Sequence, residues 1–501
     1  MNGNNDALNI LIRQFSDGFD YSLKETAIIL AAGHGKRIKS HTSKMLHEIW
    51  GKPTSQRVAE ACEAGFQMAN VILVVGIKAA EVIQKLGKKE KRSYVLQAEQ
   101  NGTGHAVQVA IENIDESNYD GTVFVFPGDM GLIDAETVAQ FKEEFYRSGA
   151  DMTVLTGIYE GNPDDNGYGR IIRAKENDRN GNETGEDAGK VIEIKEYKDI
   201  LKLKNEENYV VSFKGKEYEY TKRELIENNE FNSGVFAFKF RLLKKLINNI
   251  DSDNAQGEIY LTDMISIFNN SGYSVSAVSP EKQYVIMGFN DKTVLKQMNA
   301  IARKLVYEKI KNLVEIADPE NFFIAEPVVR QILKMDEEGI LPDIKIGVGV
   351  SIGENVEISS DIIFKRNACL SGTVKLGEKV TIGEGVHFST FPNQRIAIGN
   401  GSTIMKGNII KGNVEIGKNV LLESGVRVTG SDCYLTRIGD DVTVKGISYI
   451  FGSILDDGVW VEHSILINKR IEKILNQNGE VIPVKYFIPA PEGTEAVSKI
   501  G

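Results

Sequence analysis

The sequence predicts an α/β domain with a mostly parallel sheet, followed by a parallel β-helix built from hexapeptide repeats. Short apolar runs alternate with amphipathic segments from about residue 26 to residue 290, which is the pattern of βαβ units. After residue 340, apolar residues recur at every sixth position, which is the period of a β-helix. The length of 501 residues also fits two or three domains better than one.

The composition is that of an ordinary globular protein, with 42% hydrophobic and 26% charged residues. The net charge of −11 argues against a general nucleic-acid-binding surface, which needs an excess of lysine and arginine. Three cysteines without a CxxC pair exclude a disulfide framework, and no apolar stretch has the length of a membrane span. We therefore expect a cytoplasmic protein with no nucleic-acid partner and no membrane span.

The first strand of the α/β domain is expected at residues 27–30, and a glycine-rich loop follows it. Gly33 and Gly35 in this loop allow backbone N–H groups to approach an anion closely. Arg37 and Lys44 add two positive charges to the same loop. This combination favours a phosphate-binding site.

Two well-known phosphate motifs are nevertheless incomplete here. A dinucleotide fingerprint needs a third glycine, and Ile38 stands at that position. A P-loop needs Ser or Thr directly after Gly-Lys, and Arg37 follows Gly35-Lys36. The loop alone therefore leaves a nucleotide-phosphate site and a structural turn as equal alternatives.

Further elements alternate along the first part of the chain. We expect strands at 71–75, 123–126 and 152–155, and helices at 54–66, 103–114 and 135–146. Sheets of this type bind ligands at the carboxyl ends of their strands. The opening loop and the pair Gly128-Asp129, which follows the strand at 123–126, would both lie there.

Changes in composition set the expected boundaries. From the N-terminus we expect an extension at 1–24, the α/β domain at 25–290, a helical linker arm at 291–340, the β-helix at 341–470 and a tail at 471–501. Two hydrophilic stretches, at 176–190 and 202–229, are expected to be surface insertions in the α/β domain.

The hexad repeat of the β-helix is unusually regular. Its first set of apolar anchors is Ile346, Ile352, Ile358, Phe364, Leu370, Leu376, Ile382 and Phe388. A second set runs from Ile398 to Val428, and glycine often follows an anchor directly. The interruptions at 389–397 and 429–437 are expected to be loops that project from the coils. The flat faces of such prisms often pair with copies of themselves.

Seven segments, in order, resemble the bacterial N-acetylglucosamine-1-phosphate uridyltransferases. They are LAAGHGKR…SKMLHEIWGKP (30–53), QAEQNGTGHAV (97–107), PGD (127–129), GYGRIIR (167–173), EYKD (196–199), FNSGVFAF (231–238) and NAQGEIYLTD (254–263). The resemblance implies a Rossmann-like nucleotidyltransferase domain followed by a left-handed β-helix. It also implies Mg²⁺-dependent transfer of a uridylyl group from UTP to N-acetylglucosamine 1-phosphate, with release of pyrophosphate, by a cytoplasmic homotrimer.

The same resemblance assigns roles to individual residues. The nucleotide would be held by Leu30, Ala31, Ala32, Gly33, Gln97, Gln100, Gly102 and Thr103. The sugar would be held by Gly169, Glu196 and Asn232, and Mg²⁺ by Asp129 and Asn254. Lys44 would stabilise charge on the reacting phosphoryl group, and Arg37 would bind the leaving pyrophosphate. Carboxylate and amide oxygens suit Mg²⁺, and phosphoryl transfer depends mainly on positioning and charge neutralisation.

Structural alternatives exist for several of these residues. Asp129 is also a favoured helix cap, and Asn232 and Asn254 are common turn residues. Lys44 by itself is equally a solvated surface charge. Gln97, Gln100 and Thr103 could simply begin a helix.

The β-helix departs from the bifunctional members of the family. Those members carry His, Lys, Arg and an Asn-Tyr-Asp-Gly segment in late coils for acetyl transfer. The late part of this chain offers only His387 and His463, and Asn-Tyr-Asp-Gly does not occur. We therefore expect the β-helix to serve assembly or regulation. The alternatives are nucleotidyl transfer to glucose 1-phosphate or a related sugar phosphate, a β-helix acyltransferase, or a trimeric scaffold.

Overall fold

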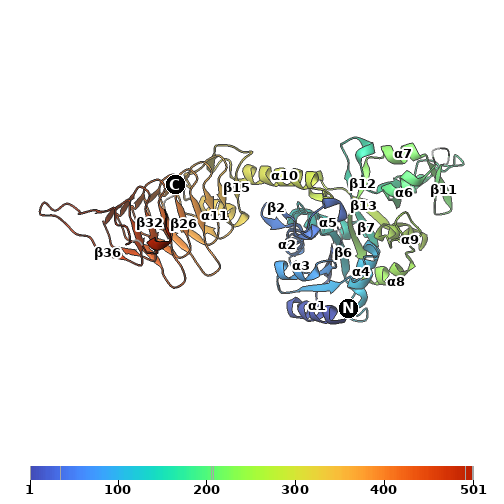
Figure 1. Ribbon diagram of the computed structural model, residues 1–501. Helices are drawn as coiled ribbons and strands as arrows, with labels where there is room; N and C mark the ends of the chain where they lie inside the picture. The colour runs from blue at the N-terminus through green and yellow to red at the C-terminus, as the bar shows by residue number, and fades with distance from the viewer. Residues whose placement is uncertain (1, 34, 205, 207, 491, 499–501) are drawn as a thin grey trace. The chain divides into compact units, whose positions relative to one another are not determined.

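The computed structural model describes the chain except residues 1, 34, 205, 207, 491 and 499–501. Parts of the expected N-terminal extension, second insertion and C-terminal tail therefore lie outside the described residues. The chain forms two compact units, residues 1–299 and 300–501, and Figure 1 shows an α/β unit and a coiled β unit. Among the described residues, no helix is long and apolar enough to cross a membrane.

The first unit is built on a nine-stranded sheet whose centre is parallel. Strands β6, β1, β4 and β5 lie side by side and run in one direction, and β12 is antiparallel to its neighbours β6 and β7. The strands of the main path are β1 (Glu25–Ala31), β4 (Asn70–Val75), β5 (Arg92–Leu96), β6 (Thr122–Pro127), β7 (Met152–Ile158), β12 (Glu230–Lys239) and β13 (Val275–Val278). This arrangement confirms the predicted Rossmann-like class.

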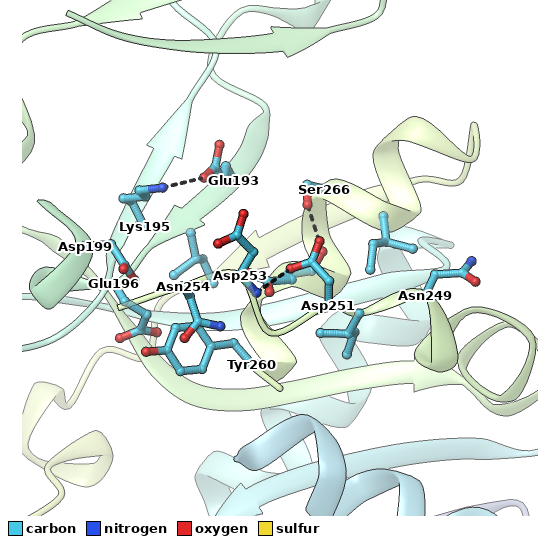
Figure 2. A pocket seen from close by; sticks show the side chains of 14 residues that line it. Glu193, Lys195, Glu196, Asp199, Asn249, Asp251, Asp253, Asn254, Tyr260 and Ser266 are labelled. Carbon is cyan, nitrogen blue, oxygen red and sulfur yellow. Dashed lines mark hydrogen bonds and ion pairs between the residues drawn. The ribbon is translucent and has the colours of Figure 1, made fainter. Parts of the chain in front are cut away.

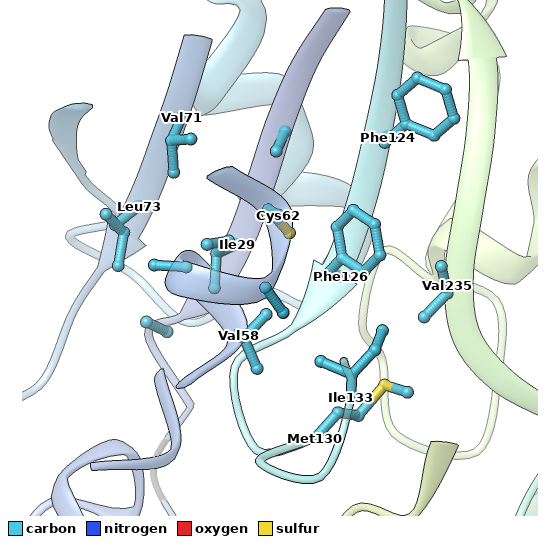
Figure 3. Close-up of a cluster of buried hydrophobic side chains, with 14 of the residues drawn as sticks. Ile29, Val58, Cys62, Val71, Leu73, Phe124, Phe126, Met130, Ile133 and Val235 are labelled. Carbon is cyan, nitrogen blue, oxygen red and sulfur yellow. The ribbon is translucent and has the colours of Figure 1, made fainter. Parts of the chain in front are cut away.

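Helices cover the sheet because its strands are apolar on both faces. On one face, Ile29, Leu73 and Phe126 pack against Val58 and Cys62 of α2 (Thr54–Phe66) (Figure 3). The alternate strand residues belong to a second core cluster with α4 (Thr103–Glu112). Successive strand residues point to opposite faces, so each apolar run contributes to both clusters.

The N-terminal extension contains a helix, α1 (Asn2–Phe15), which belongs to the first unit. It contacts β5 and α3 (Ala79–Leu86). The residues packed against the core cluster are Leu8, Leu11, Ile12 and Phe15. Their spacing of three to four positions gives α1 one apolar stripe.

The two hydrophilic stretches are more ordered than expected from their charge. The second contains the hairpin β10 (Tyr209–Phe213) and β11 (Lys216–Tyr220), and α7 (Lys222–Glu227) follows it. Alternate hairpin residues join a small separate core made of Ile172, Ala174, Ile192, Ile200, Val211, Phe213, Tyr218, Tyr220 and Leu225. This stretch thus has a small core of its own, because its charged residues alternate with buried aromatic and aliphatic ones.

The second unit is a stack of short parallel strands in three sheets, of nine, eight and seven strands. Ile346 pairs with Phe364, and Phe364 pairs with Ile382, so one coil takes eighteen residues, or three hexads. All three side chains are buried in the stack. The arrangement is consistent with a left-handed β-helix with hexapeptide repeats, as predicted.

The ends of the β-helix differ from the expected boundaries. Helices α10 (Lys292–Ile310) and α11 (Glu326–Glu337) lie in the expected linker, but so do β14 (Val314–Ile316) and β15 (Phe323–Ile324). β14 and β15 pair with β16 (Ile344–Ile346) and β17 (Ser351–Ile352), so coiling begins at Val314 and not at residue 341. The inserted α11 interrupts the hexad period and hides the first coil in the sequence. At the other end, β37 (Val484–Lys485) extends the stack into the expected tail.

Candidate active site

A cavity of about 400 Å³ opens at the carboxyl ends of β1 and β6. Its lining includes most of the residues predicted to bind substrate. They are Leu30, Ala32, Gly33, Gln97, Gln100, Gly102, Thr103, Asp129, Glu196 and Asn232. Segments as far apart in sequence as Leu30 and Asn232 thus meet in one place, and the loop after β1 and Asp129 lie there as the strand-end argument predicts.

One end of the cavity is formed by the segment that opens α4. Gly102 has a φ of 107°, and a Cβ on it would lie 2.4 Å from the carbonyl oxygen of Ile259. The backbone at Gly102 can therefore approach the backbone at Ile259 this closely only because residue 102 is a glycine. The buried side chain of Gln97 donates from Nε2 to the carbonyl oxygen of Gly102 at 3.0 Å. Thr103 Oγ1 accepts a hydrogen bond from the backbone N–H of Leu261 at 3.1 Å. These contacts fix the shape of this end of the cavity.

Beside the cavity, the ammonium of Lys44 contacts two oxygen atoms, one of which belongs to the lining residue Asp129. Its Nζ donates to Oδ2 of Asp129 at 2.5 Å and to Oδ1 of Asn290 at 3.0 Å. Both charged side chains are largely shielded from solvent, with 11% and 16% of their surface exposed. The ammonium also lies 5.4 Å from the ring centroid of buried Phe289. The structure therefore brings Lys44 and Asp129 together, and Asn290 is a member of the cluster that sequence reasoning missed.

Two glycines make this cluster possible. A Cβ on Gly35, whose φ is 57°, would lie 2.7 Å from Cβ of Lys44. A Cβ on Gly288 would lie 3.2 Å from Oδ2 of Asp129. The loop after β1 and the segment that carries Asn290 can thus pack tightly around the ion pair.

Five of the predicted residues do not line this cavity: Ala31, Arg37, Lys44, Gly169 and Asn254. The side chain of Ala31 is buried in the core below the loop, so that residue can face a ligand only through its backbone. Arg37 lies on a short 3₁₀ helix, Lys36–Ile38, and its side chain is exposed.

Glu196 and Asn232 also line the cavity, and Gly169 lies beside both of them; we call these three residues the sugar wall. A Cβ on Gly169 would lie 3.0 Å from Oε1 of Glu196, so a larger residue would press on the carboxyl group. The backbone N–H of Asn232 donates to the carbonyl oxygen of Gly169 at 2.9 Å. Burial raises the pKa of Glu196 to about 7, and the negative charges of Asp199 and Asp263 add to the rise.

A second cavity of about 250 Å³ lies behind Glu196, which lines both cavities (Figure 2). Six of its fourteen lining residues are acidic, and burial together with the charge of Asp251 raises the pKa of Asp263 to about 6. Asn254 lies here and not beside Asp129. Its Nδ2 donates to the carbonyl oxygen of Glu258, and its Oδ1 accepts from the N–H of Gln256, at 2.5 and 3.1 Å.

The predicted pairing of Asp129 with Asn254 is therefore not formed in this structure. The side chain of Asn254 is occupied by the turn of its own loop, as Asn commonly is. Among the described residues, no group of three or more His, Cys, Asp or Glu side chains forms a metal cage. Asp129 with Asn290 instead supplies one carboxylate and one amide oxygen at a single point. This donor set fits Mg²⁺, which keeps water and phosphate oxygens for the rest of its shell.

Comparison with known proteins also separates a nucleotidyltransferase part of the chain from a hexapeptide-repeat part. Residues 27–163 match the family model of the MobA-like NTP transferase domain, and residues 395–430 match the bacterial transferase hexapeptide repeat. The bifunctional protein GlmU of Clostridium botulinum is 32% identical over 426 residues, which cover 85% of this chain and 72% of the relative. Its counterpart in Acetivibrio thermocellus is 32% identical, covering 83% of this chain and 86% of the relative. That of Caldanaerobacter subterraneus is 33% identical, covering 94% and 95%. The chain belongs to the GlmU family and is a sugar-1-phosphate nucleotidyltransferase.

Proposed function

We propose that the enzyme transfers the uridylyl group of UTP to N-acetylglucosamine 1-phosphate in a Mg²⁺-dependent reaction. The products are UDP-N-acetylglucosamine and pyrophosphate. The observation that carries this proposal is the set of groups that one cavity brings together. Asp129, which pairs with Lys44, lines it together with residues of the Gln97–Thr103 segment and with Glu196 and Asn232 of the sugar wall.

The reaction is an in-line displacement at the α-phosphorus of UTP. A phosphate oxygen of the sugar phosphate forms the new P–O bond, and the bond to the departing pyrophosphate breaks. Catalysis of such a step rests on positioning and on neutralising the charge of the phosphoryl oxygens. Lys44 provides a positive charge beside the lining residue Asp129, where the reacting phosphoryl group would lie. Arg37, exposed on the loop after β1, would bind the leaving pyrophosphate.

Mg²⁺, when bound, would neutralise phosphate charge and help to orient the two reactants. We assign its protein ligands as Asp129 and Asn290, and this assignment replaces the pair expected from sequence. The support is that Asp129 Oδ2 and Asn290 Oδ1 contact the same ammonium group. The amide of Asn254 is already engaged by its own loop.

The nucleotide would lie between the loop after β1 and the segment that opens α4. The backbone of residues 30–33 would follow the ribose, and the side chains of Gln97, Gln100 and Thr103 would lie at the base end of the cavity. Gly102 is needed there because of its positive φ and its contact with Ile259.

The sugar would lie against the sugar wall. A glycine at position 169 leaves the carboxyl group of Glu196 accessible at short range. With a pKa of about 7, this carboxyl group exists in both protonation states near neutral pH, so it can accept or donate a hydrogen bond. Buried polar groups of this kind discriminate strongly against a substrate that leaves them unpaired.

The β-helix would serve assembly, as a homotrimer, or regulation, and not acetyl transfer. Of its two histidines, His387 lies on β23 (His387–Ser389) and His463 stacks on Tyr486 with ring centroids 5.4 Å apart. Incubation with acetyl-CoA and glucosamine 1-phosphate should release no thiol above background, and sedimentation should give three times the mass of the chain. Rapid thiol release would revive the acyltransferase alternative.

A substrate panel tests the proposal. Pyrophosphate release would be measured for four nucleoside triphosphates, each combined with N-acetylglucosamine, glucosamine and glucose 1-phosphates. We expect UTP with N-acetylglucosamine 1-phosphate to give the highest kcat/KM. A higher value for glucose 1-phosphate would favour the alternative sugar phosphate.

A further inference from the structure

Behind the sugar wall lies a fully buried arginine, Arg170, the first residue of β8 (Arg170–Arg173). Its exposed fraction is 0%. Within the described residues it forms no ion pair with a carboxylate, and its Nε has no hydrogen-bond partner. A buried charge without a carboxylate partner is costly and uncommon. The contacts that the guanidinium does make are therefore informative.

All of its hydrogen bonds go to one loop, residues 162–168. One terminal nitrogen, Nη1, donates to the carbonyl oxygen of Tyr168. The other, Nη2, donates to the carbonyl oxygens of Asn166 and Pro163, at 2.8 and 3.3 Å. A planar guanidinium can hold several carbonyl groups in a fixed arrangement, which a single ammonium cannot.

The guanidinium also contacts the residue next to Glu196. Its carbon lies 5.1 Å from the ring centroid of Tyr197, a cation–π contact. The hydroxyl of Tyr197 donates to the carbonyl oxygen of Asp164, at 3.0 Å, in the same loop. Arg170 and Tyr197 together therefore tie the loop to the backbone that carries Glu196.

The loop also contacts the segment that carries Asn290. Tyr168 donates from its hydroxyl to the carbonyl oxygen of Gly288 at 3.2 Å, two residues before Asn290. Its ring stacks on Phe231, the neighbour of Asn232, with centroids 4.6 Å apart. The loop held by Arg170 thus touches the neighbours of Glu196, Asn232 and Asn290.

We infer that Arg170 is a positioning residue for the sugar-phosphate substrate, which it does not itself touch. It holds the sugar wall and the Asn290 segment in register by fixing the 162–168 loop between them. This inference rests on the proposed function, because it assigns the sugar wall to the sugar phosphate.

Steady-state kinetics of Arg170→Met test the inference in the full-length chain. Methionine keeps most of the side-chain volume and removes the charge, and we expect the variant to fold. The KM for the sugar phosphate should rise tenfold or more, and the KM for UTP should stay within twofold of wild type. Arg170→Lys, which keeps the charge but not the planar fork, should give an intermediate KM.

Arg173→Met is the matched control. Arg173 lies on the same strand, but its guanidinium pairs with Glu230 at 2.7 Å and donates to the carbonyl oxygen of Gly189. Its kinetic constants should stay within twofold of wild type. Hydrogen exchange should show lost protection at residues 162–168 in the Arg170 variants only, whichever substrate the enzyme uses.

Unchanged KM values in Arg170→Met, or equal rises for both substrates, would overturn the inference. The proposed function is judged separately, by wild-type turnover of UTP with N-acetylglucosamine 1-phosphate. If the wild type prefers another sugar phosphate in the substrate panel, the KM comparison is made with that one. If it turns over none, loss of protection confined to the Arg170 variants supports the loop contact, and unchanged protection overturns it.

Discussion

The ammonium of Lys44 lies 2.5 Å from Oδ2 of Asp129, and the amide oxygen of Asn290 lies 3.0 Å from the same nitrogen. A lysine thus occupies the two oxygens that we assign to Mg²⁺, and it neutralises the charge of the carboxylate. A cation that enters between these oxygens must displace the lysine. The displaced ammonium is then available to a phosphoryl group in the same cavity.

This relationship predicts that Lys44→Met increases metal affinity in the absence of nucleotide. Removal of the competing charge leaves the carboxylate of Asp129 free, so Mn²⁺, used as a probe for Mg²⁺, should bind at least tenfold more tightly than to wild type. Isothermal titration calorimetry measures the change. Asp129→Asn is the control and should abolish binding, whereas equal affinities for wild type and Lys44→Met would contradict the competition.

The choice between Asn290 and Asn254 as metal ligand predicts different outcomes for two matched variants. Asn290→Ala removes an oxygen 3.0 Å from Lys44 Nζ, and the Mg²⁺ concentration for half-maximal activity should rise tenfold or more. Asn254→Ala removes only hydrogen bonds within its loop, and the same concentration should change less than threefold. Titration of activity with Mg²⁺ measures both, and the reverse ranking would restore the original assignment.

Strands and repeats that follow a short-range pattern were predictable from the sequence. Strand runs such as residues 71–75 and the hexad anchors from Ile346 onward repeat over short distances, so they can be identified without knowing any contact. The cavity residues Gly33 and Asp129 were also predicted, because parallel strands bring their carboxyl ends to one edge, and Gln97 was expected from the family resemblance.

Other features depend on contacts between distant residues. Asn290 joins Asp129 across more than 150 residues and belongs to none of the seven segments, so nothing in its surroundings marked it. The neighbouring Gly288 lets this segment approach Asp129, because a Cβ there would lie close to the carboxylate. In the sequence, however, a single glycine is too common to indicate a binding site. The first coil was missed because α11 interrupts its period.

The pH dependence of stability should report on Glu196. Its pKa is about 7 in the folded state against 4.5 ordinarily, so between these values the folded chain keeps a proton that the unfolded chain has released. The free energy of unfolding therefore falls as pH rises through this range, by up to about 3 kcal/mol.

Glu196→Gln should remove this effect, because the amide does not ionise. The variant should match wild type near pH 5 and melt at a higher temperature at pH 8, as measured by differential scanning calorimetry. Glu112→Gln, at an exposed position on α4, should show the same difference from wild type at both pH values. A Glu196→Gln variant less stable than wild type at pH 8 would contradict the raised pKa.

Helix α1 should contribute to the stability of the first unit. Phe15 is partly buried against the core cluster, and Phe15→Ala should lower the free energy of unfolding by about 1–2 kcal/mol. Ile10, on the same helix, is 66% exposed. Ile10→Ala should change the free energy by less than about 0.5 kcal/mol. Equal effects in calorimetry would mean that α1 does not pack as described.

The central claim is that the cavity around Lys44 and Asp129 transfers a uridylyl group to a sugar phosphate. The most direct measurement is the rate of pyrophosphate release from UTP, Mg²⁺ and N-acetylglucosamine 1-phosphate by wild type and Asp129→Asn. We expect steady release by wild type and a loss of roughly 10²-fold or more in the variant, the size typical for removal of one transition-state charge contact. No release by wild type, or equal rates for the two proteins, would contradict the claim.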